Sequence, residues 1–231
     1  MIPGIVASVS RAGEVALTRT NMFGGRTNSS PSSLFTPPNN SLLVAVVGAC
    51  QSSGNTDPSG DIGISGGGLT WTPRLTIGSP VSFSRGVRIF TAPVVTGAPM
   101  TVTGSLGARP IHSLDIHVFA YENADVANPT GVFASSNTVP GGAGPQTLTL
   151  SGPPALTSEV LAVMHTNPTS SSSPITPTPP WVEQYDIGAA NIQMQTQTRA
   201  GDASTTVSWS GVGVTFGSTN VAAAIEIRRA T

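Results

Sequence analysis

Short runs of alternating apolar and polar residues recur about every ten to fifteen residues along this chain, with turn-forming residues between them. Because side chains alternate between the two faces of a strand, this period is typical of half-buried β-strands. No stretch of the sequence shows the apolar stripe of an amphipathic helix. We therefore expect an all-β fold with about a dozen strands, near residues 4–9, 14–20, 41–49, 69–76, 86–95, 99–104, 112–121, 131–136, 145–151, 158–166, 181–187, 191–199, 205–210 and 220–229.

Three of these runs are almost continuously apolar: residues 41–49, 159–166 and the first part of 220–229. Strands that are covered on both faces have this composition, so the three runs are expected at the centre of the fold. Residues 191–199 instead alternate strictly, with glutamine at every second position from Gln193 to Gln197. One face of that strand should therefore meet solvent or a polar partner.

The turn-forming and loop segments between the apolar runs predict the architecture. Long segments rich in Gly, Ser and Pro, at residues 24–40, 51–68 and 166–180, read as loops. We expect an antiparallel β-sandwich of jelly-roll type over residues 39–231, preceded over residues 1–38 by an extended N-terminal arm with short strands. A cut near 140–145 would divide the chain into two halves, but too few strands follow it to close a core, which favours one domain.

Apolar residues of the arm are candidates for binding a partner. A strand from the arm could join the sheet edge of a neighbouring subunit through backbone hydrogen bonds and cover that edge. The residues that would face the partner are Ile5, Val6, Val9, Val15 and Leu17.

The charge pattern excludes several classes of function. Charged residues make up 9% of the chain, all ten basic residues are arginine, and the formal net charge is −1. Without clustered cations the sequence offers no footprint for nucleic acid. Cys50 is the only cysteine, which rules out an intrachain disulfide and a cysteine-based metal site. No apolar run reaches the length of a membrane span, and the first residues lack the pattern of a signal peptide, so we expect synthesis in the cytoplasm.

Three consecutive glycines in "SGGGLTWTP" (65–73) raise the question of a phosphate-binding loop. Such a loop leads into a helix N-terminus, where backbone N–H groups face the anion. Here the glycines lead into β-branched and aromatic alternation closed by Pro73. The stretch therefore predicts a bend that starts a strand.

Two small groups of residues could bind a metal ion. On a strand, Asp115 and His117 share one face while His112 lies on the other, so only two ligands converge. A polar pair between strands accounts for them better than zinc or a general base. Asp57 and Asp61 lie in a glycine-containing turn that could offer oxygens to calcium, but the acidic spacing of an EF-hand loop is missing. We expect no cofactor.

Acidic pairs of the kind used for glycoside hydrolysis cannot be assigned from spacing alone. Glu122, Asp125, Glu159, Glu183 and Asp186 are scattered along the chain, and no Gly-x-Ser-x-Gly motif occurs. We expect a protein without enzymatic activity. The weakest alternative is a glycoside-cleaving enzyme that uses Glu183 or Glu122.

Aromatic residues offer a second kind of site. Trp181 and Tyr185 follow the proline-rich loop and, on a regular strand, would share one face as a platform for a sugar ring. Because only 5% of the chain is aromatic, the other large rings are expected to fill the core.

The order of core and turn signals gives a resemblance. The segments "NNSLLVAVVGA", "GGGLTWT", "VRIFTAPVVTGAPMTVT" and "DIHVFAYENADVANPTG", followed by "NVAAAIEIRR", resemble a diffuse group of phage-encoded β-sandwich proteins and jelly-roll modules of head and tail proteins. The resemblance covers most of residues 39–229 and carries over no catalytic residue. It implies a structural role in a virion, as a capsid decoration (cement) protein or a tail-associated adhesin.

Two functions of different class follow. The first is a capsid decoration protein that binds the major capsid protein on the outer shell as a homotrimer and stabilises adjacent capsomers, which places it in the virion. The second is a glycan-binding or receptor-binding module of a tail or secreted protein that recognises a host glycan through Trp181 and Tyr185.

Overall fold

The computed structural model describes residues 16–28, 31–79, 84–139, 146–166, 175–189, 192–210 and 220–231. Within these ranges the chain is all-β, and all pairs of named strands are antiparallel, as predicted. The only helical turn that the described ranges contain is a single 3-10 turn over Ser59–Asp61. None of the described helical segments is long and apolar enough to cross a membrane.

The first half of the chain builds one five-stranded sheet and a small second layer. The strand order in the sheet is β1-β7-β2-β5-β4, and β3 pairs with β6 in the small layer. The bounds are β1 Thr18–Arg26, β2 Ser41–Gln51, β3 Ile62–Gly66, β4 Thr72–Ser79, β5 Arg85–Val94, β6 Val102–Leu106 and β7 Ile111–Glu122.

The second half builds another five-stranded sheet, in the order β12-β13-β10-β15-β8, and a three-stranded layer in the order β11-β14-β9. The bounds are β8 Thr130–Val139, β9 Gln146–Thr149, β10 Glu159–Thr166, β11 Thr176–Pro177, β12 Val182–Ala189, β13 Ile192–Ala200, β14 Thr206–Ser210 and β15 Asn220–Ile227.

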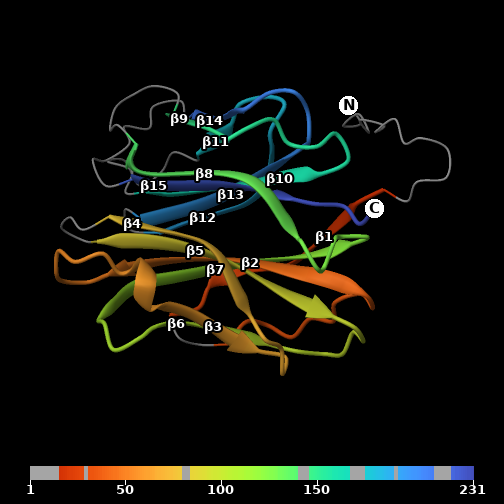
Figure 1. Ribbon diagram of the computed structural model, residues 1–231. Coiled ribbons are helices and arrows are strands. Elements are labelled where there is room, and N and C mark those ends of the chain that lie inside the picture. The colour runs from red at the N-terminus through yellow and green to blue at the C-terminus, as the bar shows by residue number, and fades with distance from the viewer. Residues whose placement is uncertain are drawn as a thin grey trace, which may run out of the picture.

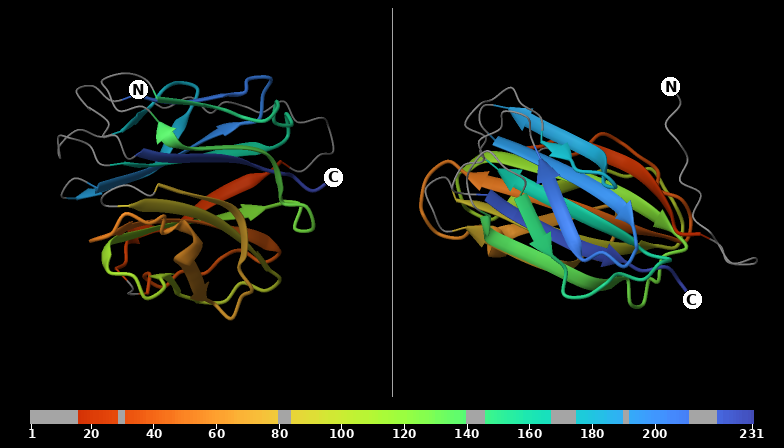
Figure 2. Two further views of the ribbon diagram at one scale, coloured as in Figure 1. Left: turned by 60° about the vertical axis from the view of Figure 1, so that its left-hand side comes forward. Right: turned by 90° about the horizontal axis from the view of Figure 1, so that it is seen from above.

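These four sheets are stacked in layers with three apolar cores between them (Figure 1). The first core lies between β3-β6 and the first large sheet, the second between the two large sheets, and the third between the second large sheet and β11-β14-β9. The two large sheets therefore pack face to face, and each is covered again on its outer face. The left view of Figure 2 shows the same layering, and in the right view, from above, the sheets lie over one another.

The layering explains the apolar runs. Alternate residues of β2 enter different cores: Leu43 and Ala45 lie in the first, whereas Val44 and Val46 lie in the second. In β10, Leu161 lies in the second core, and its neighbours on either side lie in the third. All residues of β2 and β15 are buried, so the prediction of central strands covered on both faces is confirmed.

The alternating strand at residues 191–199 meets a polar partner inside the protein. Its counterpart in the structure, β13, directs Gln195 and Gln197 toward the three-stranded layer. There Trp209 Nε1 donates a hydrogen bond to Gln195 Oε1 (2.9 Å), and Gln197 Nε2 donates one to the carbonyl of Ser208 (2.9 Å). The glutamines thus link two layers.

The glycine stretch forms a bend, as predicted. Gly66, Gly67 and Gly68 have φ values of 128°, 64° and 65°, in the region that side chains disfavour. A Cβ at Gly66 would lie 2.2 Å from the Thr101 carbonyl oxygen, so a side chain there would also block the pairing of β3 with β6. Trp71 follows directly before β4 and packs against the first core.

Residues 18–26, which fall inside the segment expected as an arm, form the edge strand β1 of the first large sheet. Leu17 is half-buried and packs against the second core. The other residues named for the arm, Ile5, Val6, Val9 and Val15, lie outside the described residues. The halves of the chain meet at residues 123–129 and not near 140–145, because β8 already belongs to the second sheet.

Candidate functional site

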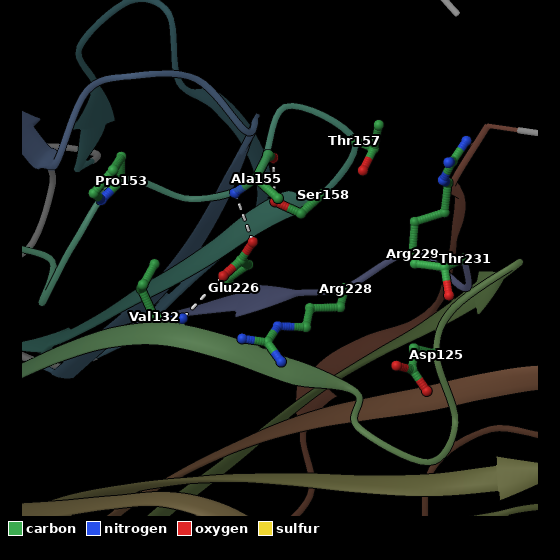
Figure 3. A pocket seen from close by; sticks show the side chains of 10 residues that line it. All are labelled: Asp125, Val132, Pro153, Ala155, Thr157, Ser158, Glu226, Arg228, Arg229 and Thr231. Atoms are coloured by element: carbon green, nitrogen blue, oxygen red, sulfur yellow. Dashed lines mark hydrogen bonds between the residues drawn. The ribbon is translucent and has the colours of Figure 1, made fainter. Parts of the chain in front are cut away.

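A hollow of about 450 Å³ lies at the end of β15, between the start of β8 and the loop before β10 (Figure 3). Glu226 is its most buried acidic residue, with 3% of its surface exposed. Its carboxylate accepts hydrogen bonds from the backbone N–H groups of Val132 (2.9 Å) and Ala155 (2.8 Å). The lining residues are Asp125, Val132, Pro153, Ala155, Thr157, Ser158, Glu226, Arg228, Arg229 and Thr231.

The hydrogen bonds show what Glu226 does in this hollow. It ties two loops to the end of β15, and both of its oxygens are engaged. A Cβ on Gly131 would lie 1.8 Å from Glu226 Oε2, so only glycine allows the carboxylate to reach both amides. Asp125 is engaged as well, since it accepts bonds from the N–H groups of Ala127 and Asn128. Both acidic side chains of the hollow therefore accept hydrogen bonds from backbone N–H groups, and the other charged side chains that line it are arginines.

A second group of charged residues is enclosed between the two large sheets. Arg26 of β1 donates from Nε to Asp115 Oδ1 (2.9 Å) and from Nη2 to Asp115 Oδ2 (3.3 Å). Asp115 has no exposed side-chain surface, whereas 23% of the Arg26 side chain is exposed. His165 of β10 lies on the other side of Asp115, with 3.9 Å between Nε2 and Oδ2. The group thus joins strands of both sheets.

Burial governs the charge states in this group. It lowers the pKa of His117 to about 3 and holds the pKa of His165 well below its ordinary value, with the cations Arg85 and Arg26 adding to the effect at His165. Burial also raises the pKa of Asp115, and Arg26 works against that rise. At neutral pH both histidines are therefore uncharged, and the charges are those of Asp115, Arg26 and the buried Arg85.

The neutral His117 is fixed by contacts from the second sheet. Its Nδ1 lies 3.0 Å from Thr196 Oγ1, and its ring lies 4.8 Å from that of Tyr185. Asp115 and His117 do share one strand face, as predicted, while His112 is exposed. Among the described residues there is no group of three His, Cys, Asp or Glu side chains that could hold a metal ion.

A third polar group stands at the opposite end of the same interface. Arg19 of β1 forms an ion pair with Glu159 of β10 (2.8 Å), and the Tyr121 hydroxyl donates to the same carboxylate oxygen (2.7 Å). Burial raises the pKa of Glu159, and Arg19 opposes it. Sequence reasoning missed both ion pairs, because each joins residues far apart in the chain.

The two aromatic residues singled out in the sequence do not form one surface. A register shift between Glu183 and Tyr185 breaks the alternation of β12. Trp181 lies in the third core with 6% exposure, under the Arg199 guanidinium at 4.9 Å, whereas the half-buried Tyr185 packs against the second core. The expectation that both rings share a face is therefore wrong, and the bulge is the reason.

The remaining candidate acids have structural partners or stand apart. Asp57 accepts a hydrogen bond from the N–H of Ser59, and Asp61 pairs with Arg109. Glu122 ends β7 in the first large sheet, while Glu183 lies on β12 in the second. Asp186 accepts two hydrogen bonds from Gln193 Nε2 (2.6 and 2.7 Å).

Comparison with known proteins gives no relative: no family model matches the chain, and neither the curated proteins nor the solved structures contain a match.

Proposed function

We propose that this chain is a structural protein of a bacteriophage virion, and that it decorates the outer capsid surface by contact and without catalysis. The observation that supports this role best is the placement of exposed apolar side chains on loops at one end of the stacked sheets. We call this the loop end and define it as residues 95–99, 123–129, 152–158 and 228–231.

Strand register brings these loops together. Ser41 begins β2 and pairs with Val94 and Glu122, so the loops after β5 and β7 leave the sheet at the same end. An isolated bridge from Ala124 to Arg229 then joins the first sheet's end to the last residues of the chain. Since Ala155 bonds to Glu226, the loop before β10 lies there too.

The loop end exposes large apolar side chains. Val95 is 78% exposed, Leu156 77% and Val126 52%. Single exposed apolar residues are ordinary on a protein surface, but three on separate loops at one end favour a contact with another protein. The hollow described above opens beside them, and its Arg228 is exposed.

The buried charges support a role without catalysis. Asp115, His117 and His165 have perturbed pKa values and no exposed surface, so these three groups are closed to a substrate. Perturbed groups also occur in structural ion pairs, which fits their position between two packed sheets.

The finer parts of the proposal are a homotrimer that contacts the major capsid protein, and a β-sandwich architecture. The face-to-face packing of the two large sheets supports a sandwich. The strand order lends the jelly-roll type no support, because each large sheet is built from one half of the chain.

Mass spectrometry of particles purified from the phage or host that carries the gene tests the proposal. The protein should be present in stoichiometric amounts and absent from tail fractions. Purified protein should then rebind particles that lack it, and a variant with Val95→Asp, Val126→Asp and Leu156→Asp should not. Val182→Asp, at an exposed residue of the edge strand β12, is the matched control. Absence of the protein from particles would refute the proposal.

The alternative function, glycan binding through Trp181 and Tyr185, draws no support from their placement on opposite faces. A glycan array separates the two functions. Specific binding that is lost in Tyr185→Ala, together with absence from particles, would favour the alternative.

A further inference from the structure

The two halves of the chain have the same strand order. The first large sheet has the order β1-β7-β2-β5-β4, and the second, read in reverse, has the order β8-β15-β10-β13-β12. Strands at the same place in the two orders are counterparts: β1 and β8, β7 and β15, β2 and β10, β5 and β13, and β4 and β12. The counterparts also follow one another in the same order along the chain. The outer layers agree too, since β3 pairs with β6 as β11 pairs with β14. The partner of β14 on its other side, β9, corresponds to the bridge that Phe35 makes with Met100 just before β6.

The correspondence extends to a bulge. Trp71 stands directly before β4 and Trp181 directly before β12. Two residues after each tryptophan the register shifts, between Pro73 and Leu75 in one half and between Glu183 and Tyr185 in the other. A shared irregularity at the same distance from the same residue type is stronger evidence of kinship than shared regular strands, because regular strands recur in unrelated proteins.

The bulged residue makes the same hydrogen bond in each half. Arg74 donates from Nε to Thr91 Oγ1 (2.8 Å), and Gln184 donates from Nε2 to Thr198 Oγ1 (2.9 Å). Both threonines lie on the neighbouring strand, β5 or β13, opposite the first residue of β4 or β12.

A second anchor, at the start of β2 and just before β10, gives the same alignment. Thr91 pairs with Val44, and Thr198 pairs with Leu161, so Val44 corresponds to Leu161. The same spacing matches Ser41 with Ser158. Both serines donate from Oγ to the carbonyl three residues earlier, at 2.7 Å to Pro38 and 2.6 Å to Ala155.

Four of the contacts between the large sheets form two pairs that this correspondence relates to each other. β1 lies against β12 and β4 against β8; β7 lies against β13 and β5 against β15. When each strand is replaced by its counterpart, the contact of β1 with β12 becomes the contact of β8 with β4. In the same way, the contact of β7 with β13 becomes the contact of β15 with β5. The two halves are therefore related by an approximate two-fold axis between the large sheets, as in a symmetric dimer.

At the axis, matching positions face each other and differ in size. Gly48 of β2 corresponds to His165 of β10, because each lies opposite an equivalent residue, Asp115 or Val221. A Cβ on Gly48 would lie 3.5 Å from His165 Cγ and 2.5 Å from Met194 Sδ. The Met194 sulfur thus occupies the space that the missing side chain leaves, and the imidazole packs beside it.

The charges are also arranged for unlike halves. Glu159 corresponds to Leu42, and Arg19 corresponds to Thr130, since Tyr121 pairs with Arg19 as Ile227 pairs with Thr130. Two second halves would bring Glu159 against Thr130 and lose the Arg19 pair, and would also set two His165 rings together. Two first halves would set Arg19 against Leu42 and leave a gap at Gly48.

We infer that this chain consists of two copies of one β-module joined in tandem, and that the contacts of His165 with Gly48 and of Glu159 with Arg19 make unlike halves pair in preference to like ones. The inner sheet face of each module is a docking surface for a second copy of the module. Two features disfavour the pairing of like modules: a small residue packs against a large one, and the ion pair can form only between unlike modules.

The test uses the full chain with a protease site in the exposed loop 126–128. The folded protein is cleaved, unfolded in urea and refolded by dilution, and its dimers are weighed by native mass spectrometry. Random association would give like pairs as about half of all dimers at equal amounts of the halves. We expect the unlike pair to exceed the like pairs at least tenfold.

A variant with Glu159→Leu and His165→Gly makes the second half resemble the first at the two deciding positions. The unlike pair then loses both the Arg19 ion pair and the His165 contact with Gly48, so the share of like pairs should rise toward the random value. The matched control, Val160→Ala with Met164→Leu, alters the opposite face of the same strand and should keep unlike pairing.

Three outcomes would overturn the inference. Halves that remain monomeric or aggregate after dilution would show that the inner sheet face does not bind a second module. Like pairs at the random level in the unaltered protein would show that no preference exists. Unchanged pairing in the double variant would show that other residues set the preference.

Discussion

Arg26 and Asp115 form a two-point ion pair in which the carboxylate is enclosed between the sheets while part of the guanidinium reaches solvent. The pair joins the edge strand β1 to β7, and Arg26 also lies 3.5 Å from the carbonyl of Ile192 in the second sheet. Loss of Arg26 would leave the buried Asp115 charge without compensation, and loss of Asp115 would leave a half-buried guanidinium without its ion-pair partner.

Asp115→Asn should therefore lower the free energy of unfolding by about 3–5 kcal/mol, since breaking a buried pair costs more than the pair contributes. Urea unfolding followed by tryptophan fluorescence measures the change. Asp61→Asn is the control: it breaks the partly exposed pair with Arg109, and the cost should stay within about 1 kcal/mol. Equal losses in both variants would contradict this account.

Stability should fall as the pH drops from about 6.5 toward 3. The folded pKa of His117 is about 3 and that of His165 lies well below its ordinary value, so the unfolded chain binds protons in this window that the folded chain does not. Each histidine then costs up to about 1.4 kcal/mol per pH unit. The raised pKa of Asp115 acts in the opposite sense near pH 4, because protonation relieves its burial.

Unfolding curves at several pH values measure this slope. His117→Gln keeps a polar group beside Thr196 and removes the titration, so the slope should shrink by about half. The exposed His112 is the matched control, and His112→Gln should leave the slope unchanged. A slope that is the same in all three proteins would place the acid sensitivity elsewhere.

Gly131→Ala should lower the free energy of unfolding by about 2 kcal/mol or more, because its Cβ would lie 1.8 Å from the Glu226 carboxylate that ties two loops together. Gly60→Ala, where a Cβ meets nothing within 4 Å, should change it by less than about 1 kcal/mol. Thermal unfolding of both variants decides the point.

Trp181→Ala should cost about 3–5 kcal/mol, since the ring is buried in the third core and lies under Arg199. Tyr185→Ala should cost less because that ring is only half-buried. Chemical unfolding of both variants measures the difference. A Trp181→Ala protein as stable as the parent would mean that the ring does not belong to the core.

The strand pattern was predictable from sequence where side chains alternate regularly. The runs at 41–49, 159–166 and 220–229 are central strands, because burial on both faces leaves no room for polar residues. The strand β3 and the two-residue β11 escaped prediction, since glycine and proline interrupt them and they are too short for a period to show.

The candidate sites were less predictable, for two physical reasons. Asp115 and His117 were correctly placed on one face, but the partner Arg26 lies 89 residues away in sequence, and only the fold brings it near. The Trp181 and Tyr185 prediction failed at a bulge, which moves every later side chain to the other face. The same bulge follows Trp71 in the first half, so the repeat shows in the strand register and was not predicted from the sequence.

The second core has a consequence for synthesis on the ribosome. The first large sheet has all its strands once Glu122 has emerged, yet its inner face is covered by Val221, Ala223 and Ile225 near the end of the chain. An apolar surface is thus exposed while the second half is still being translated. First halves of nascent chains on neighbouring ribosomes could associate through these faces. The inferred preference for unlike halves would reduce this association between chains of one polysome.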